Sequence, residues 1–179
     1  MRILLITGSF PPDRCGVGDY TFRLAEALSS LPSMQVAVLT SASRRRSNTS
    51  GAIDLFPLIA GWRISEVGAV IQVIRQWSPD RVHVQYPTQG YGKGKLPWFI
   101  PLIAFIMGKK VVQTWHEDYT RNCKREFFLK SVVPGGVIVV RHPYKEKLPF
   151  FVRCASWRKK WALIPSASNI PKIDLTEQE

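Results

Sequence analysis

Short runs of β-forming residues alternate along the chain with stretches whose apolar residues recur at helical spacing, and this alternation is the strongest constraint on the fold. Residues 3–7 form an apolar run closed by Gly8, as expected for a strand buried on both faces of a sheet. From Asp19, a suitable N-cap residue, apolar residues recur through residue 31 as on a helix. Strands that alternate with helices predict right-handed βαβ crossovers. We therefore expect an α/β fold with a mostly parallel sheet and helices on both faces.

The same patterns predict the remaining elements. Further strands are expected over residues 35–40, 53–59, 81–86, 111–115, 137–140 and 161–164, and further helices over residues 64–77, 96–107 and around 122–130. Pro57 weakens the third strand, because proline cannot donate to a ladder. In parallel sheets, ligands bind beyond the carboxyl ends of the strands. The loops after Gly8, Tyr86, Trp115 and Val140 are therefore the places to look for a site.

Length and charge limit the classes of function. The 179 residues suit one domain, and 25 Lys and Arg against 13 Asp and Glu give a net charge of +12, which favours anionic partners. Three widely spaced cysteines indicate neither a disulfide framework nor a zinc site, so we expect a reducing compartment and no metal. The apolar runs at residues 3–6 and 96–107 are too short for a signal peptide and a membrane span. We expect a cytoplasmic protein, peripheral at the inner membrane face.

The first loop ends in Gly16-Val17-Gly18-Asp19-Tyr20, between the first strand and the first helix. Glycine lets the backbone approach a ligand closely, and a helix N-terminus can receive phosphate. The dinucleotide fingerprint G-x-G-x-x-G is not met, because Thr21 stands at its third glycine position. Two interpretations remain open: the glycines bind phosphate, or they only shape the turn.

His116 follows the fifth strand and is itself followed by Glu117. A histidine there can exchange protons or donate a hydrogen bond near neutral pH, and a neighbouring carboxylate can set its charge. The zinc motif H-E-x-x-H is not met, because Thr120 stands where the second histidine belongs. A purely structural role for His116 is about equally compatible with the pattern. His83, between two valines in mid-strand, is predicted to be structural.

Two basic segments complete the set of candidates. The glycine-rich segment at residues 90–95 lacks the spacing of a P-loop and is expected to be a mobile basic loop or a flap over an anionic substrate. Residues 141–160 combine basic and aromatic side chains, which suits anionic lipid or nucleic acid. The alternative is a solvated basic face whose aromatic residues turn into the core. Lysines that flank the apolar stretch 96–107 favour a membrane over nucleic acid.

Four stretches, in order, resemble a known family. They are residues 3–20, from ILLIT through Pro11-Pro12 to GVGDY, residues 79–87 (PDRVHVQYP), residues 111–117 (VVQTWHE) and residues 164–171 (IPSASNIP). They are similar to the N-terminal domain of GT-B glycosyltransferases of family 4, also called group 1. The resemblance covers nearly the whole chain, and the order of the four stretches makes it fairly specific.

The resemblance implies a Rossmann-like, acceptor-side domain over residues 1–171, with residues 172–179 starting a linker to a donor-binding domain. The implied reaction is retaining transfer from a nucleotide-diphosphate sugar to a glycan or lipid-linked acceptor, without metal or other cofactor. Gly16 and Gly18 would lie near the diphosphate, and His116 would be the catalytic residue, a hydrogen-bond partner of the transferred sugar. The predicted substrate-binding residues are Gly16, Val17, Gly18, Asp19, Tyr20, Gln85, Tyr91 and Glu117.

Two positions depart from the family pattern: Cys15 stands where a further glycine is common, and Arg141-His142 where a small hydroxyl residue is common. We expect half of a glycosyltransferase, inactive without a donor-binding domain or subunit, acting at a membrane. The alternative is a non-catalytic basic module that binds an anionic membrane surface or, less favoured, nucleic acid.

Overall fold

A seven-stranded parallel sheet runs through the molecule in the order β3-β2-β1-β4-β5-β6-β7. The structure is a computed structural model that describes residues 1–42, 51–117, 124–141 and 145–165. The strands are β1 (Arg2–Ile6), β2 (Gln35–Ser41), β3 (Ile53–Ile59), β4 (Arg81–Tyr86), β5 (Lys110–Trp115), β6 (Gly135–Val139) and β7 (Lys159–Leu163). All six pairings are parallel, which confirms the predicted α/β architecture of a single Rossmann-like domain.

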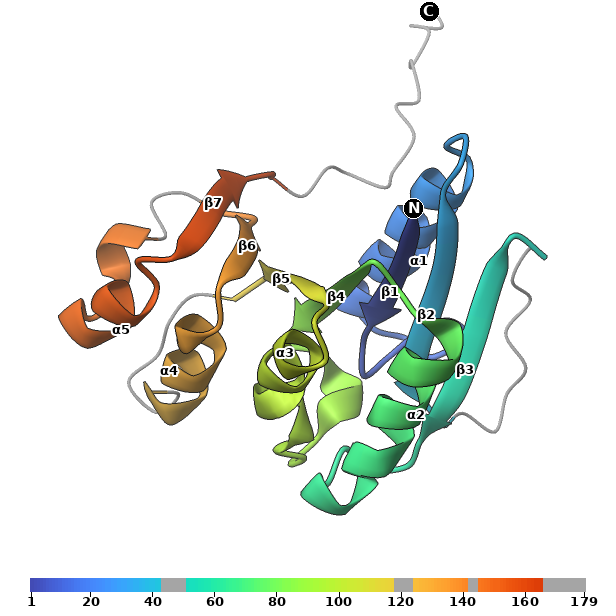
Figure 1. The fold of residues 1–179 in the computed structure, drawn as a ribbon, viewed down its shortest axis with the longest axis horizontal. Coiled ribbons are helices and arrows are strands. Elements are labelled where there is room, and N and C mark those ends of the chain that lie inside the picture. The colour runs from blue at the N-terminus through green and yellow to red at the C-terminus, as the bar shows by residue number, and fades with distance from the viewer. Residues whose placement is uncertain (43–50, 118–123, 142–144, 166–179) are drawn as a thin grey trace, which may run out of the picture.

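Helices cover both faces of this sheet. They are α1 (Gly16–Ser29), α2 (Val67–Trp77), α3 (Leu96–Ile106), α4 (Lys124–Val132) and α5 (Phe150–Ala155), with 3-10 turns η1 (Ile64–Glu66), η2 (Gln89–Tyr91) and η4 (Lys145–Lys147). Figure 1 shows α1 on one side of the sheet and α2 to α5 on the other. Right-handed crossovers require this, because the chain passes from β1 outward to β2 and β3, then returns across the sheet toward β7.

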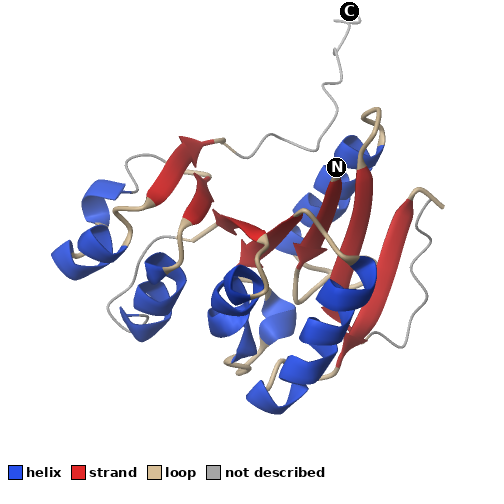
Figure 2. Ribbon diagram, viewed as in Figure 1, coloured by secondary structure: helices blue, strands red, loops and turns tan. Residues whose placement is uncertain are grey.

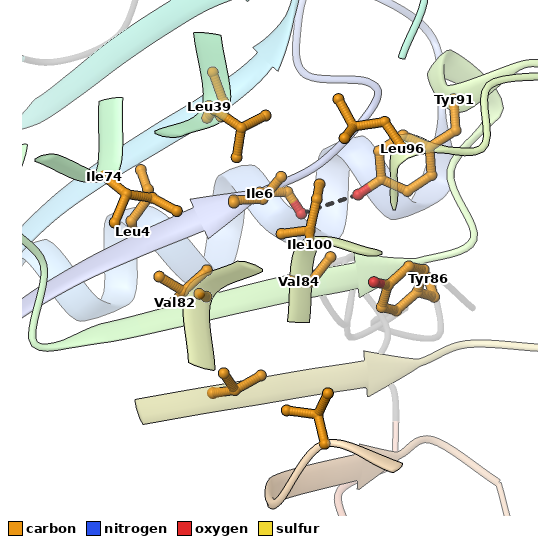
Figure 3. Packing of buried hydrophobic residues seen from close by; sticks show 14 of the residues in the cluster. Leu4, Ile6, Leu39, Ile74, Val82, Val84, Tyr86, Tyr91, Leu96 and Ile100 are labelled. Carbon is orange, nitrogen blue, oxygen red and sulfur yellow. Dashed lines mark hydrogen bonds between the residues drawn. The ribbon is translucent and has the colours of Figure 1, made fainter. Parts of the chain in front are cut away.

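Alternation along the strands separates two hydrophobic clusters. Leu4 and Ile6 belong to the larger cluster under α2 and α3, whereas Ile3 and Leu5 belong to the smaller cluster under α1. Figure 3 shows the larger cluster, where Ile100 of α3 packs above β1 and β4. Each such side chain, once fully buried, contributes about 1.5–3 kcal/mol relative to exposure. The two faces of β1 are therefore both core, as its unbroken apolar sequence predicts.

The sheet face toward α1 is less completely covered at the β7 end of the sheet. Register places Leu5, His83, Val112, Gly136 and Lys160 in one row across β1, β4, β5, β6 and β7, so they share a face. Leu5 is buried beneath α1, but exposure rises along the row until Lys160 lies in solvent. The strands that α1 does not reach thus present an open face (Figure 2).

Most differences from the predicted elements lie at their ends. Helix α1 begins at Gly16, not at Asp19, so the glycines form its first turn. Pro57 is tolerated because β3 is an edge strand that pairs with β2 alone. Helix α5 was not predicted, since its six residues are too few for a clear periodicity. Contrary to the idea that the aromatic residues of this segment turn into the core, Phe150 and Trp157 are each 79% exposed.

Candidate functional site

The sheet reverses its strand order between β1 and β4, and this is where parallel α/β sheets bind ligands. After β1 the chain turns toward α1 on one face, and after β4 it turns toward α3 on the other. The two loops therefore separate at the carboxyl ends of adjacent strands. His116, directly after β5, borders the same edge, which we call the carboxyl edge.

The loops after β1 and β4 are joined at their base by backbone packing. Gly8 N donates to Thr88 Oγ1 at 2.8 Å, and Gly90 N donates to Ser9 Oγ at 2.8 Å. A Cβ atom on Gly90 would lie 1.6 Å from the carbonyl oxygen of Gly8, so no other residue fits there. At Gly90, segment 90–95 therefore packs closely against the loop after β1.

Tyr91, one of the predicted substrate-binding residues, lies in the core. Its ring packs edge-on against Trp62 with centroids 4.8 Å apart, and its hydroxyl donates to the Ile6 carbonyl at 3.2 Å (Figure 3). Burial raises the pKa of the Tyr91 hydroxyl well above its usual value. The structure thus gives Tyr91 a packing role beneath the carboxyl edge, apart from the other predicted site residues.

The N-terminus of α1 faces the carboxyl edge through Gly16, Val17 and Gly18, whose backbone N–H groups lie in the first helical turn. The two glycines differ in their surroundings. A Cβ atom on Gly18 would lie 2.9 Å from the Ser9 carbonyl oxygen, so Gly18 is required for packing. A Cβ atom on Gly16 would meet no described atom within 4 Å. The space beside Gly16 is open to a ligand, and packing does not explain why glycine stands there.

Cys15 is the N-cap residue of α1, with an extended backbone. Partial burial acts to raise the pKa of its thiol, but the adjacent backbone of Gln89 and Gly18 outweighs this effect. The net result is a pKa below the ordinary value of a cysteine. Backbone dipoles at this helix end therefore favour a negatively charged atom, which is the property that phosphate binding requires.

A chain of hydrogen bonds crosses from β5 to β4 on the face toward α1. His116 Nε2 lies 3.0 Å from Gln85 Oε1, and Gln85 Nε2 lies 3.3 Å from His83 Nε2. His83 Nε2 also lies 2.8 Å from Thr114 Oγ1. Gln85 and Thr114 are fully buried, and His83 is 7% exposed. His83 is therefore structural, as its position in mid-strand predicts.

The chemistry of the Gln85 amide determines where the protons lie in this chain of hydrogen bonds. An amide oxygen can only accept, so His116 Nε2 carries the hydrogen and donates to Gln85. The amide nitrogen of Gln85 can only donate, so His83 Nε2 accepts. Burial lowers the pKa of His116 to about 4, and burial followed by repulsion from His116 lowers that of His83 to about 4. Both rings are neutral at pH 7, and His116 Nδ1 keeps a lone pair that can accept a hydrogen bond.

The remaining predicted residues surround His116 unequally. Tyr20, from the second turn of α1, packs edge-on against the His116 ring with centroids 4.8 Å apart. This contact joins the helix N-terminus to the histidine. Asp19 is half-buried on the same helix, and Glu117 is exposed next to His116. Burial lowers the pKa of His116 and keeps its ring neutral at pH 7.

The hydrogen-bond chain was not foreseen as a unit, although its signal is present in the sequence. His83 and Gln85 are two residues apart on one strand, and Thr114 and His116 are two residues apart where the next strand ends. A period of two places each pair on one face, and the register Gln85 to Thr114 brings the pairs together. Polar residues at alternate positions of adjacent, otherwise apolar strands could have indicated this network.

Within the described ranges, no group of three or more histidine, cysteine, aspartate or glutamate residues is placed to hold a metal ion. No described helix combines the length and the apolar character needed to cross a membrane. In comparisons with known proteins, no family model matches the chain, and a search of curated proteins finds no significant match.

Proposed function

We propose that the chain is the acceptor-side domain of a retaining glycosyltransferase. It would use a nucleotide-diphosphate sugar as donor and a glycan or lipid-linked molecule as acceptor, together with a donor-binding domain or subunit. The diphosphate would approach the N-terminus of α1 at Gly16, and His116 would accept a hydrogen bond from a sugar hydroxyl through Nδ1. No metal or other cofactor takes part in this proposal.

One observation carries the proposal: the N-terminus of α1 and a neutral, oriented histidine meet at the point where the strand order reverses. Tyr20 joins them directly, with its ring centroid 4.8 Å from that of His116. A glycosyl donor needs both features side by side, an anion site for the diphosphate and uncharged hydrogen-bonding groups for the sugar. The four matched sequence stretches support the same assignment, because three of them form this edge.

Binding of nucleoside diphosphates tests the proposal. We expect UDP or GDP, titrated without divalent metal, to shift the amide NMR signals of Gly16, Val17 and Gly18 and the ring signals of His116. The substitution Gly16→Ala puts a methyl group into the open space and should weaken binding at least tenfold. Gly68→Ala on α2 is the matched control, because a Cβ atom there also meets no atom within 4 Å. It should leave binding unchanged.

Two results would overturn the proposal. Shifts that cluster away from the carboxyl edge, or equal binding by both glycine variants, would remove the diphosphate site. Measurement of sugar transfer by the chain alone tests the need for a partner. Efficient turnover would show that this chain contains the complete active site and is not one half of it.

A further inference from the structure

A pocket of about 570 Å³ lies at the opposite edge of the sheet, where β4, β5, β6 and β7 begin. We call this the amino edge. Two segments that the sequence singled out separately meet here: Lys109 and Lys110, which follow α3, and Arg158 and Lys160, which flank the start of β7. The pocket therefore forms only in the folded chain, from residues of separate segments of the sequence.

Small residues make the hollow. Gly136 stands between Val112 and Lys160 in the register row on the open face, and it contributes no side chain. Neighbouring Gly135 has a φ of +144° and approaches Val111 so closely that a Cβ atom would lie 2.3 Å from the Val111 carbonyl oxygen. Gly108, with a φ of +72°, turns the chain away after α3. These turns leave the beginnings of β5 and β6 uncovered.

Five cationic side chains line the pocket, and none of its described lining residues carries a carboxylate. They are Arg81, Lys109, Lys110, Arg158 and Lys160. None of the five forms an ion pair with any residue in the described ranges. Five like charges around one hollow repel each other unless an anion joins them. The pocket is therefore complementary to a ligand with a concentrated negative charge, such as a phosphate group.

Apolar side chains also line the pocket, and exposed apolar side chains stand next to its lining residues in the sequence. Phe105, Val111 and Val112 contribute to its lining. Ile106 follows Phe105 at the end of α3 and is 74% exposed, and Trp157 precedes Arg158 and is 79% exposed. The guanidinium of Arg158 lies 5.9 Å from the ring centre of Trp157. Exposed aliphatic and indole groups beside cations are the combination that membrane interfaces bind.

We propose that the amino edge docks on a membrane, with the pocket binding the headgroup phosphate of an anionic phospholipid and Ile106 and Trp157 entering the interface. This inference does not depend on the glycosyltransferase assignment. It implies a definite orientation, because the two edges lie at opposite ends of six-residue strands such as β4. Strands of that length hold the carboxyl edge about 20 Å above the lipid surface.

Vesicle binding by the full chain tests the proposal. We expect binding to phosphatidylcholine vesicles that contain phosphatidylglycerol, weak binding to phosphatidylcholine alone, and a blue shift of Trp fluorescence on binding that Trp157→Ala reduces. The triple variant Lys110→Gln/Arg158→Gln/Lys160→Gln should lower the partition coefficient about 100-fold, since each cation near an anionic surface contributes about fivefold. The matched control is Arg14→Gln/Arg23→Gln/Arg75→Gln, three exposed cations elsewhere with the same change of charge. It should lose less than tenfold.

Circular dichroism and thermal unfolding establish that both triple variants are folded before binding is compared. Equal losses in the two variants would show diffuse electrostatic attraction and overturn the pocket as the site. Soluble glycerol phosphate that binds the pocket while vesicles do not would assign it to a free phosphate ester instead. Short single-stranded RNA that binds more tightly than vesicles, and loses its affinity in the pocket variant, would replace the membrane with nucleic acid.

Discussion

The two edges of the sheet accommodate polar and charged side chains in opposite ways. At the carboxyl edge, buried His83, Gln85 and Thr114 form hydrogen bonds with each other. Both His83 and His116 are neutral at pH 7. At the amino edge, five cations surround an open pocket without a carboxylate among its lining residues. In the described part of the chain, a group of five cations therefore lies away from the predicted site. This group lies at the opposite end of the same strands.

This difference separates two kinds of recognition. A closed network of neutral groups has one arrangement and can orient a ligand, but it exerts little long-range attraction. Unpaired cations attract any anion over the Debye length, and they depend on salt. The carboxyl edge is suited to fix the position of a reacting group, and the amino edge to hold the molecule at a charged surface.

The largest effect should come from the backbone packing at the carboxyl edge. Gly90→Ala places a methyl group 1.6 Å from the Gly8 carbonyl oxygen, and only movement of the loop or of β1 can relieve the clash. We expect a loss of about 5 kcal/mol or more in unfolding free energy, enough to unfold many domains. Urea denaturation measures it, with Gly68→Ala as the control that should stay within about 1 kcal/mol of the wild type. A folded Gly90→Ala variant of normal stability would show that the two loops are not packed in this way.

That packing also shows what sequence patterns can and cannot predict. The alternation of strands and helices predicts the architecture, and the bounds of β3 and β4 match the prediction. Glycines carry no periodic signal, so the first turn of α1 and the first residues of β6 were missed. The contact between Gly8 and Gly90 joins residues 82 positions apart, and only the folded chain reveals it.

The next effect concerns a buried cation at the start of β7. Lys159 is 6% exposed and its Nζ donates to the Val133 carbonyl at 2.8 Å. Burial, followed by repulsion from Lys130, lowers the pKa of Lys159 to about 7. Because the unfolded chain keeps this proton up to its ordinary pKa, stability should rise between pH 7 and about 10.5, by at most about 1.4 kcal/mol per pH unit.

Lys159→Met removes this titration and should flatten the rise, as measured by urea unfolding at pH 7, 8, 9 and 10. Lys160→Met is the matched control, because its side chain is exposed on the opposite face and the rise should remain. An unchanged slope in Lys159→Met would mean that Lys159 keeps an ordinary pKa, and that the cationic character of the amino edge extends into the core.

The carboxyl edge should respond in a different pH window. His83 and His116 have pKa values of about 4 in the folded chain and about 6.5 when unfolded, so stability is full above pH 6.5 and is lost as the pH falls toward 4. The loss is about 3 kcal/mol for one histidine and larger for the pair, because a proton on one ring repels a proton on the other.

His116→Asn should reduce the acid loss substantially, whereas Lys159→Met should leave it unchanged. Urea unfolding at pH 7, 6, 5 and 4 measures both. Equal acid sensitivity of His116→Asn and the wild type would contradict the buried, neutral histidine. If the two pH windows respond independently, the two edges are electrostatically separate, as their distance along the strands predicts.

The sequence also predicts the candidate site only in part. His116 and the first turn of α1 follow from the rule that ligands bind beyond strand ends. Tyr20 and Gln85 belong to the stretches that resemble a known family, and the structure brings them close to His116. Tyr91 was selected on its place in a glycine-rich loop, but its large apolar ring is buried against Trp62. The cationic pocket could not be predicted, because its side chains come from three separate segments.

The smallest effect should appear at Cys15, and it tests whether the carboxyl edge can hold an anion without a cation. The backbone of Gln89, Gly18 and Val17 and the Ser9 hydroxyl offset burial and lower the pKa of the thiol, with no basic side chain among the contributors. We expect the pH midpoint of iodoacetamide alkylation at Cys15 to be lower in the folded chain than in urea, as followed by peptide mass spectrometry. The exposed thiol of Cys154 serves as the internal control for reagent and folding. A midpoint at or above that of the unfolded chain would mean that burial prevails. In that case the first turn of α1 would offer little to a diphosphate, and the anion-binding capacity of the molecule would belong to the amino edge.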